Sequence, residues 1–224
     1  MKKILVANLT AKKAVKYLEE KGFEVIISSQ ASDDDFLAHT DVDGILIMMH
    51  PFGESLMSKM PNLKVIARHG VGYDNVDLAA AAKHYIVVTN TPGANATAVA
   101  EMAIMHMLMA GRLYYQRREL LTDTTNADYL AAHNGQEISG KTVGIIGFGH
   151  IGQNIDRLLT GFDVNVLAYA RHSHEVVNGR MATLDEIYEQ SDFIVTALPA
   201  TPETTHMINA DVFSKMKSSA VLVN

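Results

Sequence analysis

Residues Thr142–Gly152 read TVGIIGFGHIG, an apolar run followed by a glycine-rich turn and a stretch of helical character. The turn has the pattern GxGxxG, with glycines at 147, 149 and 152. In such a turn the first glycine permits a tight bend, the second lets the main chain approach a pyrophosphate, and the third lets the helix pack against the strand. Amide N–H groups at the start of the helix are free to bind phosphates. Because the pattern follows a β-branched strand and opens a helix, it predicts a dinucleotide site rather than a glycine turn without a ligand.

The composition indicates a protein with a sizeable apolar core. The chain has 224 residues, of which 48% are hydrophobic and 20% are charged, enough for one large domain or two smaller ones. The net charge of −6 argues against a nucleic-acid partner. The sequence contains no cysteine, which excludes disulfides and thiolate chemistry, and we predict no metal site. The run Ile4–Ala7 is too short for a signal sequence or a membrane span, so we predict a cytoplasmic protein without membrane association.

Short apolar runs alternate with helical segments in the first half of the chain, which is typical of α/β proteins with a parallel sheet. The predicted strands are Lys3–Ala7, Glu24–Ser28, Gly44–Met49, Lys64–Arg68 and Tyr85–Val88. The predicted helices are Ala11–Lys21, Asp33–His39, Ser55–Lys59 and Asp77–Lys83, with Asp77 as a helix cap. We predict an incomplete flavodoxin-like substrate domain over residues 1–98.

The alternation starts again in the second half. A single long helix is predicted from Asn95 to Leu121, with Asn95 or Thr97 as its cap, and a polar surface arm over Asp123–Gly140. The later strands are Thr142–Ile146, Asn165–Tyr169, Phe193–Leu198 and Ala220–Val223, and the later helices are Ile151–Thr160, Leu184–Glu189 and Ala210–Met216. Thr183 and Glu186 form a capping-box pattern, and Thr201-Pro202-Glu203 is typical of a helix start. We predict an incomplete, doubly wound Rossmann domain over residues 99–224, with the ligands in a cleft between the two domains.

The end of the second strand of this Rossmann domain indicates the choice of cofactor. NAD-preferring domains place an Asp or Glu there to bind the ribose hydroxyls. Here the position is Ala170, and Arg171, His172 and Ser173 follow it. Arg171 can pair with a 2′-phosphate, which a carboxylate would repel. We therefore predict NADP(H) in preference to NAD(H); the alternative is a solvated Arg171 and a site that accepts either cofactor.

Other candidate ligand contacts lie at the carboxyl ends of the predicted strands. The turn Gly70–Gly72 either leaves main-chain N–H groups accessible to a carboxylate or merely ends a strand. His50 and His69 each follow a strand, where open α/β sheets bind ligands, and the alternative for each is a structural or solvated histidine. Thr97 is predicted to cap a helix, to contact the cofactor, or both.

Four segments carry a family resemblance: Leu63–Asp77, Asn90–Glu101, Gly140–Gly152 and Leu198–Thr204. Together they resemble the D-isomer-specific 2-hydroxyacid dehydrogenase family, which includes phosphoglycerate dehydrogenases and glyoxylate/hydroxypyruvate reductases. The resemblance implies hydride transfer between a nicotinamide cofactor and a small 2-oxo or 2-hydroxy acid such as glyoxylate, hydroxypyruvate or a phosphorylated relative. It also implies a homodimer. Within the helix Asn95–Leu121, the stripe formed by Met102, Met105, Met109 and Leu113 is explained by core packing, and the family uses this region as its dimer interface.

The resemblance also assigns roles to residues. It implies that the amides of Val71 and Gly72 hold the substrate carboxylate and that the main chain at Leu198-Pro199 contacts the nicotinamide side of the cofactor. With the histidines above, the predicted substrate-binding residues are His50, His69, Val71 and Gly72. The predicted cofactor-binding residues are Thr97, Gly147, Gly149, His150, Ile151, Gly152, Ala170, Arg171, His172, Ser173, Leu198 and Pro199.

The family's catalytic Arg, Glu and His follow the last strand of this sequence, beyond Asn224. We therefore expect the sequence to be a piece of a longer chain. In that case this piece contains none of the catalytic residues. Two alternatives remain at this point. One is a dinucleotide-sensing interaction protein without catalysis, because fold does not fix function. The other, more distant, is a formate dehydrogenase, whose longer N-terminal extension is not seen here.

Overall fold

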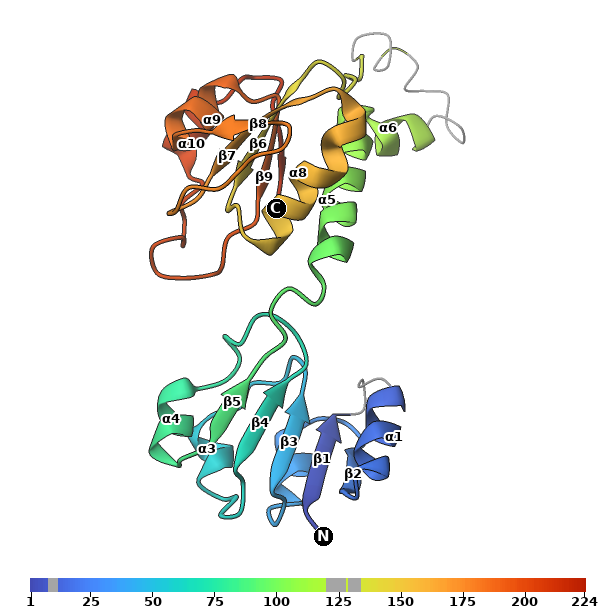
Figure 1. Cartoon of the computed structure of the whole chain (residues 1–224), viewed down its shortest axis with the longest axis vertical. Helices are drawn as coiled ribbons and strands as arrows, with labels where there is room; N and C mark the ends of the chain where they lie inside the picture. The colour runs from blue at the N-terminus through green and yellow to red at the C-terminus, as the bar shows by residue number, and fades with distance from the viewer. Residues whose placement is uncertain (8–11, 120–127, 129–133) are drawn as a thin grey trace. The chain divides into compact units, whose positions relative to one another are not determined.

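The computed structural model describes residues 1–7, 12–119, 128 and 134–224. The described chain forms two compact units, Met1–Asn95 and Ala96–Asn224, and each is built around one five-stranded sheet (Figure 1). Within those ranges no helix has the length and apolar character needed to cross a membrane. Most of the surface arm predicted over residues 123–140, and the last two residues of the helix predicted to end at Leu121, lie outside the described residues.

The first unit has the strand order of flavodoxin-like folds. Its sheet runs β2-β1-β3-β4-β5 with every neighbouring pair parallel. The strands are β1 Lys3–Ala7, β2 Glu24–Ser28, β3 Gly44–Ile47, β4 Val65–Arg68 and β5 Val87–Thr89. The helices are α1 Lys12–Glu20, α2 Asp33–Leu37, α3 Glu54–Met57 and α4 Leu78–Lys83. The α/β class predicted from the alternating pattern is confirmed.

The central strands of the first unit are apolar runs because their side chains are buried in its core. Leu5, Ile45 and Ile66, from three neighbouring strands, are at most 1% exposed and pack with Phe36 and Phe52. Parallel strands of this kind are covered on both faces, so they lack the alternation of a half-exposed sheet. The predicted cap of α4 is also present, because the Asp77 side chain accepts the Ala80 amide at 2.9 Å.

The second unit has the Rossmann order. Its parallel sheet runs β10-β9-β6-β7-β8, so that the first strand of the unit, β6, lies in the middle. The strands are β6 Thr142–Ile146, β7 Asn165–Tyr169, β8 Gly179–Met181, β9 Phe193–Thr196 and β10 Val221–Val223. The helices are α5 Ala96–Gly111, α6 Tyr114–Glu119, α8 His150–Leu158, the 3-10 segment η2 Leu159–Phe162, α9 Leu184–Gln190 and α10 Ala210–Lys215.

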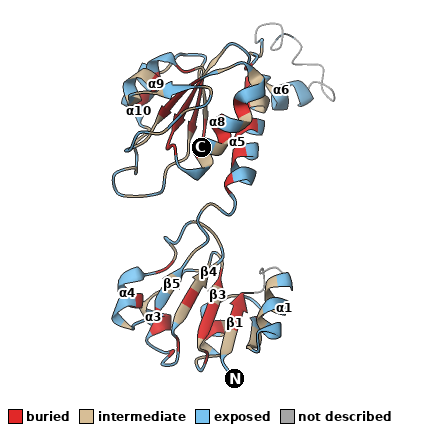
Figure 2. Ribbon diagram, viewed as in Figure 1, coloured by how far each residue is buried: buried red, intermediate tan, exposed pale blue. Residues whose placement is uncertain are grey.

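Helices cover both faces of this second sheet. One apolar cluster joins Val143 and Ile145 of β6 to residues of α5 and α8, and another joins Ile146 to residues of α9 and α10. Figure 2 shows the buried strands between the exposed outer surfaces of the helices. Gly144 faces α9 so closely that a Cβ there would lie 2.6 Å from Ile187 Cγ2. The predicted capping box at the start of α9 is confirmed, with Thr183 and Glu186 bonded reciprocally.

The single long helix predicted from Asn95 to Leu121 is wrong. The structure ends α5 at Gly111 and begins α6 at Tyr114, with Leu113 in the left-handed region at φ 53°. The Gly111 carbonyl accepts the Gln136 amide at 2.7 Å, so another segment of the chain takes an acceptor that a continuing helix would use. Propensity alone did not reveal this tertiary contact.

Two of the four residues of the stripe, Met102 and Met105, lie outside the core that was predicted for them, whereas Met109 and Leu113 are half-buried. Met102 and Met105 are 50% and 42% exposed, whereas Ala100, Ala103 and Met107 form the buried face of α5. The helix is apolar around most of its circumference, so the sequence did not identify its buried side.

Three smaller predictions also differ from the structure. Strand β8 was missed, because its sequence Gly179-Arg180-Met181 is short and largely exposed. Strand β5 begins two residues later than predicted, because Tyr85 adopts φ 55° and the Ile86 amide returns to Ala81 at the end of α4. Residues 202–206 form turns rather than the helix start predicted at Thr201.

Candidate functional site

The glycine turn of the second unit lies at the carboxyl end of β6, between β7 and β9. The Gly147 amide donates to the Tyr169 carbonyl of β7 at 2.9 Å. On the other side, the Ala197 amide donates to the Ile146 carbonyl at 2.8 Å. The turn is therefore fixed to both neighbouring strands at the point where the strand order reverses, which is where open α/β sheets bind ligands.

The three glycines of the turn meet different surroundings. Gly147 has φ +100°, and a Cβ there would lie 2.5 Å from the Ala197 carbonyl oxygen. A Cβ at Gly152 would lie 2.4 Å from the Gly147 carbonyl oxygen, so only glycine lets α8 approach the turn this closely. Around Gly149, by contrast, no atom lies within 4 Å of the Cβ position. Two glycines thus serve the packing of the protein, and the third keeps the outer side of the turn open.

The residues at this turn fit a pyrophosphate. Gly149 is the N-cap of α8 and offers no side-chain cap. The amides of His150, Ile151 and Gly152 occupy the first helical positions, which have no acceptor within the helix. These donors, the positive end of the helix dipole and the open space at Gly149 suit a phosphate anion.

The predicted cofactor-selecting residues follow β7 directly. Ala170 is half-buried and packs against the core, whereas Arg171, His172 and Ser173 are exposed. A hydrogen bond from the Thr201 side chain, and to a lesser degree the charge of Arg171, hold the pKa of the Glu203 carboxyl below its usual range. Arg171 and Glu203 therefore act on each other electrostatically, from the loops after β7 and β9.

The loop after β9 carries Leu198 and Pro199. Leu198 packs against the core and would lie 3.1 Å from a Cβ at Gly147, while Pro199 is exposed. The Thr204 hydroxyl donates to the Pro199 carbonyl at 2.6 Å and accepts the Thr201 amide at 2.9 Å. The loop is thus closed by its own threonines and lies beside the glycine turn. Thr97 lies in the first turn of α5, one residue past its start, and so is not the N-cap.

The candidate substrate turn of the first unit follows β4. The Gly70 amide donates to the Arg68 carbonyl at 3.0 Å, and the Gly70 carbonyl accepts the Thr91 amide at 3.0 Å. Asn90 Nδ2 donates to the Val71 carbonyl at 2.8 Å. In the described part of the chain, the amides of Val71 and Gly72 donate to no main-chain acceptor. The turn is therefore fixed by hydrogen bonds to Arg68, Asn90 and Thr91 and presents two N–H groups that suit a carboxylate.

Arg68 is a polar residue of this turn to which the sequence assigned no role. Its Nη1 donates to the His69 carbonyl at 2.9 Å, and its Nη2 lies 3.3 Å from Met49 Sδ. Its Nε is buried without a partner among the described residues. A guanidinium held over Gly70 brings a positive charge to the turn. The sequence did contain a feature that could have identified Arg68. It is an arginine at the last position of an apolar strand, where parallel sheets bind their ligands.

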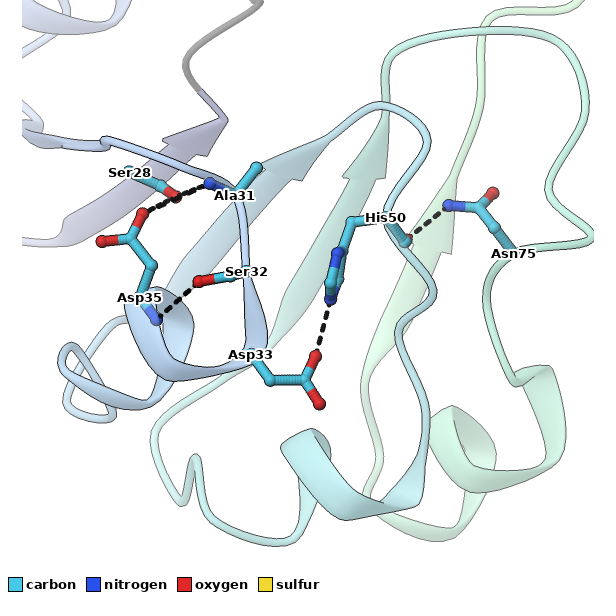
Figure 3. A network of polar contacts seen from close by, with 7 residues as sticks. All are labelled: Ser28, Ala31, Ser32, Asp33, Asp35, His50 and Asn75. Atoms are coloured by element: carbon cyan, nitrogen blue, oxygen red, sulfur yellow. Dashed lines mark hydrogen bonds and ion pairs between the residues drawn. The ribbon is translucent and has the colours of Figure 1, made fainter.

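The two histidines predicted to line the substrate pocket have different surroundings. His50 Nε2 lies 2.6 Å from Asp33 Oδ1, and the His50 carbonyl accepts Asn75 Nδ2 at 2.8 Å (Figure 3). The His50 ring also packs edge-on against Phe36. His69 is exposed, and its amide donates to the Ile47 carbonyl at 2.8 Å. The imidazole of His50 is therefore held toward α2, whereas the imidazole of His69 is accessible.

A second carboxylate, Asp35, lies beside Ser28 and Ser32 in Figure 3 and fixes the start of α2. Asp35 accepts hydrogen bonds from the Ser28 hydroxyl and from the Gln30 amide, the latter at 2.9 Å. These bonds hold the pKa of Asp35 below its usual range. The Ser32 side chain caps α2 by accepting the Asp35 amide at 3.3 Å. This network is accounted for by the ends of β2 and α2 and needs no ligand.

The chain matches one family model and many known proteins. Residues 104–224 match the model described as "D-isomer specific 2-hydroxyacid dehydrogenase, NAD binding domain". A glyoxylate reductase from Pyrococcus furiosus is 31% identical over 236 residues, which cover 99% of this chain and 70% of the relative. A hydroxypyruvate reductase from Thermotoga maritima is 38% identical over 164 residues, which cover 73% of this chain and 53% of the relative.

The fold is shared with a solved structure that contains a cofactor. The NAD-dependent formate dehydrogenase from Staphylococcus aureus in complex with NAD superposes with a TM-score of 0.86 at 34% identity. The match covers 99% of this chain and 72% of that one.

Proposed function

The chain belongs to the D-isomer-specific 2-hydroxyacid dehydrogenase family of NAD-dependent oxidoreductases, and on that premise we propose that it serves hydride transfer between NAD(P)H and a small 2-oxo or 2-hydroxy acid. The family and the oxidoreductase function predicted from the sequence are confirmed by the relatives, and the Rossmann prediction by the sheet order. The observation that carries the proposal is the open, uncapped turn at Gly149, because a dinucleotide needs such a cradle.

The chain's own residues bind and orient the cofactor in this proposal. The bound nicotinamide supplies the hydride. The amides of His150, Ile151 and Gly152 bind the pyrophosphate, and the loop at Leu198-Pro199 lies on the nicotinamide side. Orientation of this kind lowers the barrier because the reacting groups no longer lose rotational freedom in the transition state.

We propose NADPH as the preferred cofactor, because Arg171, His172 and Ser173 are exposed and the residue directly after β7 is Ala170 rather than a carboxylate. The test is the substitution Arg171→Ala, with the dissociation constants of NADPH and NADH measured by fluorescence titration. Loss of a charged hydrogen bond is expected to raise the NADPH constant about 10- to 100-fold and to leave the NADH constant nearly unchanged. An unchanged NADPH constant contradicts the preference for NADP(H) but not the dinucleotide site.

We propose that the substrate carboxylate binds the amides of Val71 and Gly72. The neighbouring guanidinium of Arg68 favours anionic substrates at this turn and admits a phosphorylated acid beside glyoxylate and hydroxypyruvate. The test compares the binding of two 2-oxo acids, glyoxylate and phosphohydroxypyruvate, to the NADPH-loaded protein and to the NADPH-loaded variant Arg68→Met. If the guanidinium binds the phosphate, Arg68→Met weakens the binding of the phosphorylated substrate more than the binding of glyoxylate. If the role of Arg68 is structural, the substitution weakens the binding of both equally.

We also propose a homodimer in which α5 forms the interface. The support is the exposed apolar surface of this helix, made by Val99, Met102 and Met105, which are 37%, 50% and 42% exposed. Exposed apolar side chains gathered on one helix are typical of association surfaces. The cytoplasmic location stays a prediction from the sequence.

A further inference from the structure

A single buried side chain attaches the loop after β7 to α8. Asp156 of α8 is 1% exposed and is the only buried carboxylate in the described part of the chain. Its Oδ2 accepts the Val177 amide at 2.6 Å, and its Oδ1 accepts the amide and the Nδ2 group of Asn178 at 3.1 Å and 2.9 Å. The Asn178 side chain also donates to the Asp156 carbonyl.

These bonds fix the far end of the loop. A buried carboxylate is unfavourable unless its oxygens are hydrogen-bonded. The loop is therefore stabilised in the conformation in which Val177 and Asn178 donate to Asp156. Asn178 is held from its other side as well, because its carbonyl accepts the Val166 amide of β7 at 3.0 Å. Gly179 then lies so close to β7 that a Cβ would be 1.9 Å from the Val166 carbonyl oxygen.

The near end of the same loop is fixed by β7 and the glycine turn. The Tyr169 carbonyl accepts the Gly147 amide at 2.9 Å, one residue before Ala170. Between the two fixed ends lie the exposed residues Arg171, His172 and Ser173. The place of the Arg171 guanidinium relative to the pyrophosphate cradle therefore depends on both attachments.

The loop borders a cavity and has two side-chain contacts of its own. The cavity, of about 290 Å³, is lined by Asp156 and by residues such as His150, Asn154, Arg157 and Glu175. Val176 packs against the core, and the His174 ring lies 5.9 Å from the Phe148 ring. The middle of the loop is thus held by Val176 and the His174 ring, and its far end by the hydrogen bonds of Asp156.

We infer that Asp156 is a positioning residue for cofactor selectivity, which holds the loop so that Arg171 reaches the 2′-phosphate of NADPH. The inference rests on the proposed binding of NADPH by Arg171. Asp156 itself touches no cofactor in this arrangement. Its contribution is specific to the 2′-phosphate, because the pyrophosphate cradle at Gly149 is held by other bonds.

The test is Asp156→Asn, which keeps the size of the side chain but replaces one acceptor by an NH₂ group facing N–H donors. The dissociation constants of NADPH and NADH are measured by fluorescence titration. We expect the NADPH constant to rise about tenfold and the NADH constant to change less than about twofold, because only the charged hydrogen bond is weakened. A structural role alone would move both constants together.

Two further variants complete the experiment. Asn154→Ala is the matched control, because Asn154 lies on the same helix and lines the same cavity, but among the described residues its side chain bonds to His150 and Arg157 of α8 and not to the loop. The ratio of its NADPH and NADH dissociation constants is expected to equal that of the wild type. Asn178→Ala leaves the carboxylate in place and removes one donor, so it tests the same attachment if Asp156→Asn fails to fold.

The double variant Arg171→Ala/Asp156→Asn separates the possible failures. If Asp156 acts through Arg171, the double variant has the same NADPH dissociation constant as the single variant Arg171→Ala. An additive effect, or equal ratios in Asp156→Asn and the wild type, overturns the inference. If Arg171→Ala alone has no effect on NADPH, it is the proposed cofactor preference that fails. If the wild type binds neither cofactor, the proposed function fails.

Discussion

The guanidinium of Arg68 occupies the space that any side chain at residue 70 would need. A Cβ built on Gly70 would lie 1.2 Å from Arg68 Nη1. Gly70 also has φ +151°, in a region that favours glycine. The shape of the candidate substrate turn and the place of its nearest cation are therefore coupled.

This coupling predicts the effect of Gly70→Ala. The methyl group must displace the guanidinium from the His69 carbonyl, and the backbone is strained, so we expect a loss of about 1–3 kcal/mol in the free energy of unfolding. Chemical denaturation measures the loss. In the background Arg68→Ala only the backbone strain remains, so the same substitution should be less destabilising there. Equal losses in both backgrounds would show that the two residues are independent.

Two glycines of the dinucleotide turn are expected to respond in opposite ways. Gly152→Ala places a methyl group against the Gly147 carbonyl and should destabilise the protein by about 1–3 kcal/mol. Gly149→Ala meets open space and should cost less than about 1 kcal/mol, yet raise the NADPH dissociation constant at least about tenfold. Thermal unfolding and fluorescence titration measure the two effects. Unchanged binding in Gly149→Ala would place the cofactor elsewhere.

The capping box of α9 predicts a dependence of stability on pH. Hydrogen bonds from the Arg180 guanidinium and from Thr183 lower the pKa of Glu186 to about 2. The carboxylate binds its proton less readily in the folded chain, so its stabilisation is complete above the ordinary pKa of about 4.3. The stabilisation is lost as the pH falls from there through about 2.

The variant Glu186→Gln checks this dependence. It should melt at a lower temperature than the wild type at pH 7, and the difference in Tm should shrink as the pH falls toward 2. Glu189→Gln, on an exposed position of the same helix, is the control and should show little difference at either pH. A difference in Tm that stays constant with pH would rule out the carboxylate as its source.

The α5 interface predicts that a charge at Met105 breaks the dimer. We expect Met105→Glu to halve the mass measured by sedimentation equilibrium, because burying an unpaired carboxylate in an apolar interface is unfavourable. Phe213→Glu, at a 53% exposed position of α10, should leave the mass unchanged. A wild-type protein that sediments as a monomer would contradict the proposed interface directly.

The sequence predicted the two sheets well because their central strands are buried apolar runs with clear boundaries. It identified β6 and the turn at Gly147 from local chemistry alone. It did not show that the long helix breaks at Leu113, because the break depends on the contact between Gly111 and the distant Gln136. It also did not show β8, because that strand is held in place by Asp156 and β7 rather than by its own sequence. The contacts of Arg68 with His69 and Met49 could not be predicted for the same reason, since they follow from the fold of the turn around it.

The position of β6 in the middle of its sheet has a consequence for synthesis. Val143 pairs with Phe193, and the Thr142 amide bonds to Asp192, fifty residues further along the chain. As the chain leaves the ribosome, the glycine turn emerges well before Ala197, which fixes one side of it. Pairing between such distant segments is slow because the intervening chain must first be closed into a loop. The nucleotide cradle therefore cannot take its final form until β9 has been made, although its glycines are made about fifty residues earlier.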